Sequence, residues 1–306
     1  MRVLFLGTPS WAVPSLEGLL EAGAEVAAVV TNPDRPSGRG MELKPPPVKE
    51  TAVAAGLEVL QPAGARSPEF FERITAIAPD VAVVVAYGSI LPKPVLDAVP
   101  HGFVNVHFSL LPEYRGAAPV QRAVMDGKKE TGVSIMVLTE GMDEGPVVAA
   151  AATEIGASET AGQLGERLAG IGATLLAETL PAYVDGTIDP VPQDDSLATY
   201  APKISTDEVR IDWSRPASEI HDLVRGLNPA PGAWSTFRDA RVKVHATTPA
   251  AGSDLGPGEI DGDAELLVGT GDGNLRLDEV QPAGKKRMDG SEMKRGMRPE
   301  PGERLQ

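Results

Sequence analysis

Two side chains that could act on a carbonyl group, Asn105 and His107, lie two residues apart. Residues 102–108 are mostly apolar and β-favouring, which predicts a strand, and alternate side chains of a strand point to the same face. Ser109 and Pro112 end the strand pattern. An amide donor beside a titratable imidazole suits the stabilisation of a carbonyl oxygen that gains negative charge. A buried asparagine and a core histidine with structural roles would give the same pair, so the pair alone leaves both interpretations open.

An acidic residue, Asp143, could complete this site. It follows the predicted strand 132–138, within the sequence Gly-Met-Asp-Glu-Gly-Pro. Because neighbouring parallel strands end at one edge of a sheet, where ligands bind, we expect Asp143 to reach His107. A carboxylate beside an imidazole favours the charged form of the ring and fixes its orientation. The alternative is that Asp143 is only a turn residue before Gly145.

The elements that must hold these residues alternate between strand-like and helix-like patterns in the first half of the chain. Strands are predicted at 2–6, 24–31, 81–86, 103–108 and 132–138, and helices at 11–22, 50–55, 68–77 and 158–183. Short runs of Val and Ile suit strands that are covered on both faces, so we predict an α/β fold with a doubly wound, mostly parallel, Rossmann-like sheet. The stretch from Gly7 to Trp11 lacks a G-x-G-x-x-G pattern, which argues against a nicotinamide enzyme.

A second, smaller domain is predicted beyond residue 205. Residues 185–205 contain several prolines, which is typical of a linker. A helix at 216–227 and strand candidates at 234–248, 258–260, 265–269 and 275–280 follow, separated by Gly and Asp turns. Short, closely spaced strands predict a small β-barrel. The expected organisation is therefore a catalytic domain at 1–184, a linker at 185–205 and a C-terminal domain at 206–306.

Composition excludes several kinds of site. The chain has no cysteine, which rules out disulfides, a thiolate nucleophile and a cysteine zinc site, and its four histidines argue against a histidine-rich metal site. No segment approaches the roughly 20 apolar residues that cross a bilayer, and the run from Val3 to Leu6 is too short for a signal peptide. We expect a cytoplasmic, monomeric enzyme without a metal.

The distribution of charge is uneven. A net charge of −15 argues against a general nucleic-acid-binding protein, because phosphate contacts need Lys and Arg. Residues 285–298, however, carry a local charge of +4, and residues 34–49 carry +2. Such runs are usually solvated surface, so they do not identify a partner by themselves.

The segment 105–119, NVHFSLLPEYRGAAP, resembles the active-site segment of the formyltetrahydrofolate-dependent formyltransferases. The resemblance extends in order along nearly the whole chain, through RVLFLGTP (2–9), NPDRPSGRGMELKPPPVK (32–49), VVVAYGSILP (83–92), YAPKI (200–204), RIDW (210–213), NPAPGAW (228–234) and QPAGKKRM (281–288). Each stretch is a weak signal, whereas the ordered set is specific. The resemblance implies that the C-terminal barrel is OB-like.

The resemblance also implies a reaction, in which a formyl group passes from 10-formyltetrahydrofolate to an amine. Asn105 would donate to the charged oxygen of the tetrahedral species, His107 would donate or protonate, and Asp143 would hold His107 and help remove the proton of the amine. The folate is expected beside Tyr87, Gly88, Ile90, Ser109, Leu110, Leu111, Pro112, Gly141 and Met142, with the two leucines serving mainly in packing. The family often has a small residue after the active-site histidine, so Phe108 predicts altered packing of the adjacent wall.

The acceptor amine is the remaining question, and initiator methionyl-tRNA is the interpretation that the loop at 32–49 favours. Arg39, flanked by two glycines, could approach a phosphate or stack on a base. The expected tRNA-binding residues are Arg39, Lys44, Lys285, Lys286 and Arg287. The alternatives are a folate-dependent formyltransferase or formyl hydrolase that acts on a small-molecule amine, and a non-catalytic OB protein that binds nucleic acid.

Overall fold

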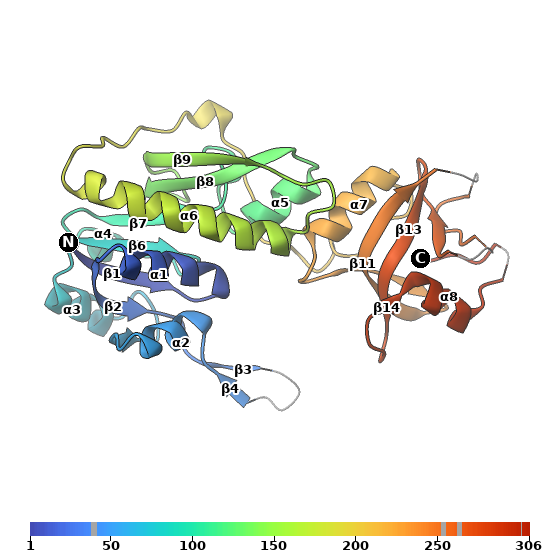
Figure 1. The fold of residues 1–306 in the computed structure, drawn as a ribbon, viewed down its shortest axis with the longest axis horizontal. Helices are drawn as coiled ribbons and strands as arrows, with labels where there is room; N and C mark the ends of the chain where they lie inside the picture. Colours follow the sequence, from blue (N-terminus) through green and yellow to red (C-terminus); the bar gives the residue numbers. More distant parts are fainter. Residues whose placement is uncertain (38–41, 252–254, 262–264, 301) are drawn as a thin grey trace. The chain divides into compact units, whose positions relative to one another are not determined.

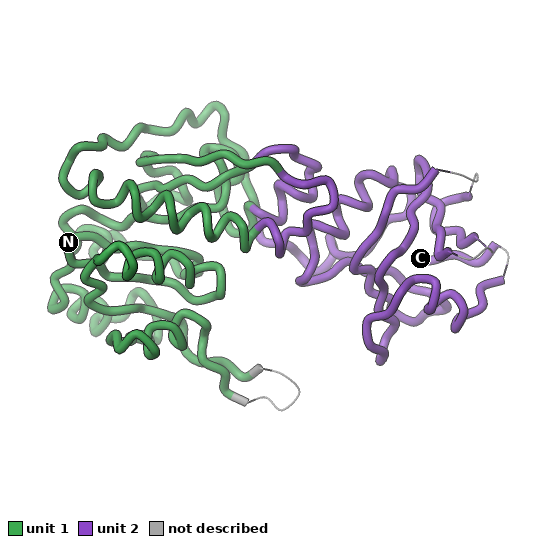
Figure 2. Tube along the Cα trace, in the orientation of Figure 1, with its two compact units in different colours: residues 1–119, 131–154, 165–201 green, residues 120–130, 155–164, 202–306 purple. Residues whose placement is uncertain are grey.

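The computed structural model describes residues 1–37, 42–251, 255–261, 265–300 and 302–306, which form two compact units (Figure 2). The first unit comprises residues 1–119, 131–154 and 165–201, and the second comprises residues 120–130, 155–164 and 202–306. Within these described ranges, no helix is long and apolar enough to cross a membrane.

The first unit is built on a sheet with the strand order β5-β2-β1-β6-β7-β8-β9 (Figure 1). Its strands are β1 (Arg2–Gly7), β2 (Glu25–Val30), β5 (Val59–Leu60), β6 (Val81–Val85), β7 (Phe103–His107), β8 (Glu130–Val137) and β9 (Val147–Glu154). The pairs β1·β2, β1·β6, β2·β5 and β6·β7 are parallel, and β7·β8 is antiparallel. The predicted α/β fold with a mostly parallel sheet is therefore confirmed. All side chains of β6 are buried, as its run of Val and Ala predicts for a strand covered on both faces.

The helices begin where the sequence supplies helix-starting residues. They are α1 (Val13–Glu21), α2 (Pro47–Ala54), α3 (Pro68–Ile77), α4 (Lys93–Leu96), α5 (Pro119–Met125) and α6 (Ala161–Val184). Short 3-10 helices lie at η1 (Ser10–Ala12) and η2 (Asp195–Leu197). In α3 the hydroxyl of Ser67 accepts from the N–H of Phe70 and proline occupies the first turn, which satisfies the exposed helix end.

Helix α6 packs closely against the strand that carries Asn105 and His107. A Cβ placed on Gly172 would lie 2.7 Å from Val106 Cγ1, so only glycine permits this approach. On the same face, Phe108 is buried and meets Trp11 edge to face, with ring centroids 5.9 Å apart. The aromatic residue after the histidine therefore packs in the core and is directed away from the functional face.

A small hairpin of β3 (Arg35–Ser37) and β4 (Glu42–Lys44) extends from the first unit. Its base is fixed because the ammonium of Lys49 donates to both carboxylate oxygens of Asp34, at 2.9 and 2.8 Å, and to Gln61. The hydrogen bonds from Lys49, followed by one from the Gln61 amide at 2.8 Å, lower the pKa of the Asp34 carboxyl. Residues 38–41, including the predicted Arg39, lie outside the described residues.

The second unit contains a small antiparallel sheet, which confirms the predicted C-terminal β domain. The elements are α7 (Ala217–Gly226), β10 (Ala233–Phe237), β11 (Ala240–Ala250), β12 (Leu267–Gly269), β13 (Asn274–Pro282), β14 (Met288–Asp289) and α8 (Gly290–Met297). The predicted single strand 234–248 is wrong in one respect. It is two strands joined at Arg238 and Asp239, which adopt positive φ angles of 48° and 62°. The candidate at 258–260 forms isolated bridges, Glu259 with Arg304 and Ile260 with Val268, in place of a strand.

Candidate active site

Strand β7 presents Asn105 and His107 from the interior of the sheet. Asn105 pairs with Val84 of β6 on one side and with Met136 of β8 on the other. Asn105 is half-buried and His107 is only 5 % exposed. Their two-residue spacing places both side chains on one face of the strand, as the sequence predicts.

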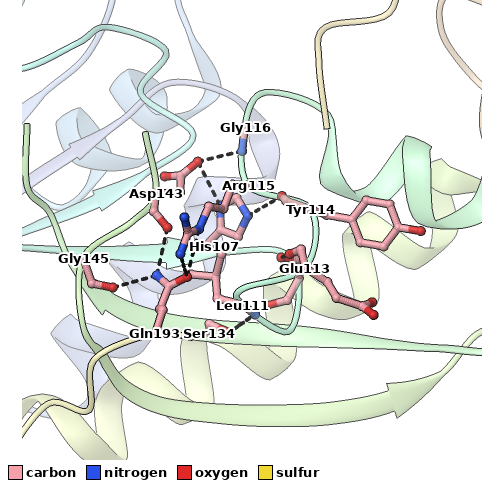
Figure 3. Close-up of polar contacts among 11 residues, drawn as sticks. His107, Leu111, Glu113, Tyr114, Arg115, Gly116, Ser134, Asp143, Gly145 and Gln193 are labelled. Carbon is pink, nitrogen blue, oxygen red and sulfur yellow. Dashed lines mark hydrogen bonds and ion pairs between the residues drawn. The ribbon is translucent and has the colours of Figure 1, made fainter. Parts of the chain in front are cut away.

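The ring of His107 is fixed by a partner on each side (Figure 3). Its Nε2 lies 2.9 Å from the carbonyl oxygen of Tyr114, and its Nδ1 lies 3.7 Å from Oδ2 of Asp143. A carbonyl oxygen can only accept a hydrogen bond, so Nε2 carries a proton and donates it. Nδ1 is therefore the ring nitrogen that the main chain does not engage, and it faces the Asp143 carboxylate.

The turn that carries the Tyr114 carbonyl is held by hydrogen bonds along its length. The hydroxyl of Ser109 donates to the carbonyl of Glu113 at 2.6 Å. Ser134 on β8 accepts from the N–H of Leu111 at 3.0 Å and donates to the Ser109 carbonyl at 2.8 Å. Tyr114 itself has a φ of 59°, which turns its carbonyl toward the imidazole. The Ser-Leu-Leu-Pro segment is thus a rigid support for the orientation of His107.

Asp143 reaches His107 by a different route from the one that the sequence suggests. Strand β8 runs antiparallel to β7, with Val137 beside Val104, so the end of β8 lies beside the start of β7. Residues 138–146 then return to bring the carboxylate to the imidazole. The expectation based on parallel strand ends was wrong about direction, although the two side chains do meet.

The Asp143 carboxylate is held from the main chain as well. Its Oδ2 accepts from the N–H of Gly116 at 2.9 Å. Gly116 has a φ of 122°, and a Cβ there would lie 2.8 Å from the carbonyl oxygen of Ala201, so both conformation and space require glycine. The same oxygen therefore receives a fixed N–H on one side and faces Nδ1 of His107 on the other.

Two residues that were not predicted as site residues, Arg115 and Gln193, complete the arrangement. The Gln193 amide donates to the carbonyl oxygens of Asp143 and Gly145, at 2.8 and 2.7 Å. Its oxygen accepts from Nε and Nη2 of Arg115, at 3.0 and 2.9 Å. Gln193 lies in the stretch 185–205 that its prolines mark as a linker, yet residues 185–201 belong to the first unit. The signal available for Arg115 was its place within the segment 105–119 that carries the family resemblance.

Arg115 is nearly fully buried, at 2 % exposure, and its charge is balanced. Burial disfavours the guanidinium charge, but an ion pair of 2.7 Å with Asp195 outweighs this and raises the pKa of Arg115. The N–H and carbonyl of Arg115 also bond to the carbonyl of Thr199 and the N–H of Ala201. Residues 193–201 therefore form one wall of the site.

The residues predicted to contact folate occupy different environments. Tyr87 is buried among core side chains, and burial raises the pKa of its phenol. Ile90 and Met142 are 72 % and 59 % exposed, and Gly88 is also exposed. The remaining predicted positions are buried or half-buried along the two turns that flank His107; they are Ser109, Leu110, Leu111, Pro112 and Gly141.

The predicted basic residues are exposed where they are described. Lys44 lies on β4 of the first unit, and Lys285, Lys286 and Arg287 lie between β13 and β14 of the second. Arg287 pairs with Glu279 at 3.3 Å. Among the residues that the structure describes, no cluster of three or more His, Asp or Glu side chains is arranged to hold a metal ion.

The chain is similar to known proteins over nearly its whole length. Residues 1–180 match the formyl transferase family, and residues 203–298 match the formyl transferase C-terminal domain. The chain is 48 % identical to a methionyl-tRNA formyltransferase of Streptomyces coelicolor, over 100 % of this chain and 99 % of the relative. It is 44 % identical to one of Bacillus velezensis, over 99 % and 97 % of the two chains.

Solved structures share the fold at lower identity. An N-formyltransferase of Helicobacter canadensis, solved with folinic acid and dTDP-3-aminofucose, superposes with a TM-score of 0.70 at 17 % identity, over 92 % of this chain and 99 % of that one. HypX of Aquifex aeolicus, solved with tetrahydrofolic acid, gives a TM-score of 0.64 at 19 % identity, over 96 % of this chain and 47 % of that one. The sequence matches over the whole length, together with the two family matches, establish that the chain belongs to the methionyl-tRNA formyltransferase family of formyl transferases.

Proposed function

We propose that this enzyme transfers the formyl group of 10-formyltetrahydrofolate to the amino group of initiator methionyl-tRNA, which gives N-formylmethionyl-tRNA for translation initiation in the cytoplasm. The observation that carries the proposal is the orientation of His107, whose Nε2 donates to a main-chain carbonyl while Nδ1 faces the Asp143 carboxylate. The relatives named above that act on methionyl-tRNA support the choice of acceptor. Solved neighbours with folinic acid or tetrahydrofolic acid support a folate donor.

The chemistry follows from the charges that develop during transfer. The amine nitrogen attacks the formyl carbon, and the formyl oxygen becomes negative in the tetrahedral species. Asn105 and the protonated Nδ1 of His107 stabilise this oxygen, and one such donor is worth roughly 3–4 kcal/mol of barrier. The Asp143 carboxylate accepts the proton that leaves the amine, directly or through water. The bond from the formyl carbon to the folate nitrogen then breaks as the proton taken up by Asp143 passes to that nitrogen, which returns Asp143 to its carboxylate form.

Recognition of the tRNA is assigned to two separate basic regions. The first region is Lys44, on the hairpin whose base is fixed by the Lys49 to Asp34 ion pair, together with Arg39, five residues before it in the sequence. Lys285, Lys286 and Arg287 form the second region, on the surface of the C-terminal unit. Phosphate contacts from both would hold the acceptor arm in a chain whose net charge is −15.

An assay with 10-formyltetrahydrofolate tests the proposal. Aminoacylated initiator tRNA and glycinamide ribonucleotide are supplied together, and formylated products and free formate are quantified. We expect formylmethionyl-tRNA as the main product. Formylated glycinamide ribonucleotide would establish a small-molecule transferase, free formate alone would establish a hydrolase, and tRNA binding without turnover would establish a non-catalytic binding protein.

A further inference from the structure

We propose that Gln193 is a positioning residue for the reaction, which holds Asp143 in place and is itself held by the buried guanidinium of Arg115. Only the kinetic test of this inference rests on the proposed function. The contacts that carry it are the four hydrogen bonds of the Gln193 amide, two received from Arg115 and two given to the 143–145 turn (Figure 3).

The orientation of the Gln193 amide is determined by its partners. A guanidinium has only donors and a carbonyl oxygen has only acceptors, so the amide oxygen must face Arg115 and the amide nitrogen must face the turn. In this orientation all four contacts, between 2.7 and 3.0 Å, are satisfied at once. No flipped amide and no carboxylate can make the same set.

The turn that receives these two hydrogen bonds needs an external support. Asp143 has a φ of 53°, a left-handed conformation that a non-glycine residue seldom adopts. Gly145 lies so close to the carbonyl oxygen of Val137 that a Cβ there would be 1.8 Å away. Gln193 bonds the carbonyls on both sides of Glu144, and thereby keeps the carboxylate of Asp143 directed at His107 and at the N–H of Gly116.

Arg115, which donates to the Gln193 amide oxygen, is itself held in place. It is 2 % exposed, and the Asp195 carboxylate and the main chain of Thr199 and Ala201 hold it in place. The sequence of contacts therefore runs from a buried charge through one amide to the catalytic carboxylate. Arg115 and Gln193 are separated from each other by 78 residues in the chain, so this arrangement exists only in the folded site.

The sharpest variant is Gln193→Glu. It keeps the acceptor for Arg115 but places a carboxylate oxygen against the carbonyls of Asp143 and Gly145. Displacement of a catalytic group by about 1 Å can cost up to about 100-fold in rate, so we expect kcat to fall about 10- to 100-fold with KM values within about threefold. Gln193→Met, which removes all four contacts without adding charge, should lower kcat by a similar factor.

A double-substitution experiment separates positioning from general loss of stability. In an Asp143→Asn background, Gln193→Glu should lower kcat by less than about threefold, because its target is already absent. The control is Gln163→Leu, which removes an amide that accepts from the N–H of Thr160 at the start of α6. It should lower the melting temperature and leave kcat unchanged. An equal loss from Gln193→Glu in both backgrounds would overturn the proposal.

Hydrogen exchange supplies a readout that does not depend on activity. The N–H of Gly116 bonds to Asp143, whereas the N–H of Ala118 in the same segment bonds to the carbonyl of Ala201. In Gln193→Glu, exchange at Gly116 should accelerate about tenfold or more while exchange at Ala118 stays unchanged. Equal acceleration at both, or none at either, would show that Gln193 does not hold Asp143. If the wild-type enzyme formylated no tRNA, the proposed function would fail while this measurement still decided the role of Gln193.

Discussion

Two histidines, one in each unit, are almost equally buried and differ in what surrounds their rings. His107 is 5 % exposed, with a carbonyl oxygen at one nitrogen and a carboxylate facing the other. His245, on β11 of the second unit, is 3 % exposed; its Nε2 lies 3.3 Å from the Gln281 side-chain oxygen, and its Nδ1 has no partner within the described part of the chain. Burial, followed by the positive charge of Arg287, lowers the pKa of His245. Similar burial therefore goes with different partners: a carboxylate faces the ring of His107, whereas only an amide oxygen lies near that of His245, and we propose a role in the reaction for His107 alone.

The largest effect that this comparison predicts is the loss of catalysis when His107 or Asn105 is replaced by alanine. Removal of one donor to a charged oxygen should lower kcat about 100- to 1,000-fold. His245→Ala, at an equally buried histidine, should leave kcat of the folded protein within about threefold of the wild type. Steady-state kinetics with both substrates saturating measures all three variants. Comparable losses for His107→Ala and His245→Ala would mean that burial, and not the partner set, explains the role of His107.

A smaller effect is expected from changing the basic surface residues of the second unit, because they would attract the tRNA and would take no part in proton transfer. Lys285→Glu with Lys286→Glu should weaken tRNA binding and reduce the slope of log K against log salt by about 2, because about two fewer phosphates are neutralised. Arg287 is left in place because it pairs with Glu279. Arg66→Glu, at an exposed position of the first unit, changes the net charge by −2 and is the control for a single reversal, Lys285→Glu. An unchanged slope in the double variant would remove these two lysines from the tRNA interface.

The sequence predicted the parts of the site that depend on local pattern. Asn105 and His107 share a strand face because side chains alternate along any strand, and that rule needs no tertiary information. The approach of Asp143 to His107 was anticipated for a wrong reason, since the direction of β8 relative to β7 has no local signature. The break at Arg238 and Asp239 was missed because the turn has no glycine and begins with Arg238, although Asp239 is a residue type that such turns favour.

The contacts of Gln193 show where prediction from sequence ends. The residue lies among Pro190, Pro192 and polar neighbours, a composition typical of a solvated connection. Its partners Arg115 and Asp143 are 78 and 50 residues away, so their alignment depends on the fold of the whole unit. No periodicity or motif within the stretch distinguishes an amide with four fixed partners from one in solvent.

The stability of the second unit should depend on pH through His245. Its pKa is lower in the folded protein than the unfolded value of about 6.5, so the unfolded chain binds more protons between these two values. The contribution of His245 is therefore fully present above about pH 6.5 and is lost as the pH falls toward the folded pKa. Urea unfolding followed by tryptophan fluorescence between pH 5 and pH 8 should show this decline, and His245→Gln should flatten it. An identical decline in the variant would assign the pH dependence to other groups.

The smallest expected effect comes from giving His245 the kind of partner that His107 has. Gln281→Glu would place a carboxylate next to Nε2 of His245, at the position now held by the amide oxygen. A neighbouring negative charge favours the imidazolium and raises the histidine pKa, so the loss of stability below about pH 6.5 should become shallower. The same urea series measures how steeply the free energy of unfolding falls with pH, and the control is the double variant His245→Gln with Gln281→Glu. A steeper acid decline in the single variant would contradict the view that the partner decides the behaviour of the ring.

The wall formed by residues 193–201 limits how the enzyme can be divided into modules. The first family match ends at residue 180 and the second begins at residue 203, so residues 181–202 lie in neither match. That stretch nevertheless supplies Gln193, Asp195 and Thr199 to the site. A chimaera joined at residue 180 would retain Asn105, His107 and Asp143 but would lose the native contacts of Gln193 and Asp195, which we propose align Asp143. Exchange of C-terminal domains among such enzymes must therefore be made beyond residue 201, because the connecting segment is inherited with the catalytic unit.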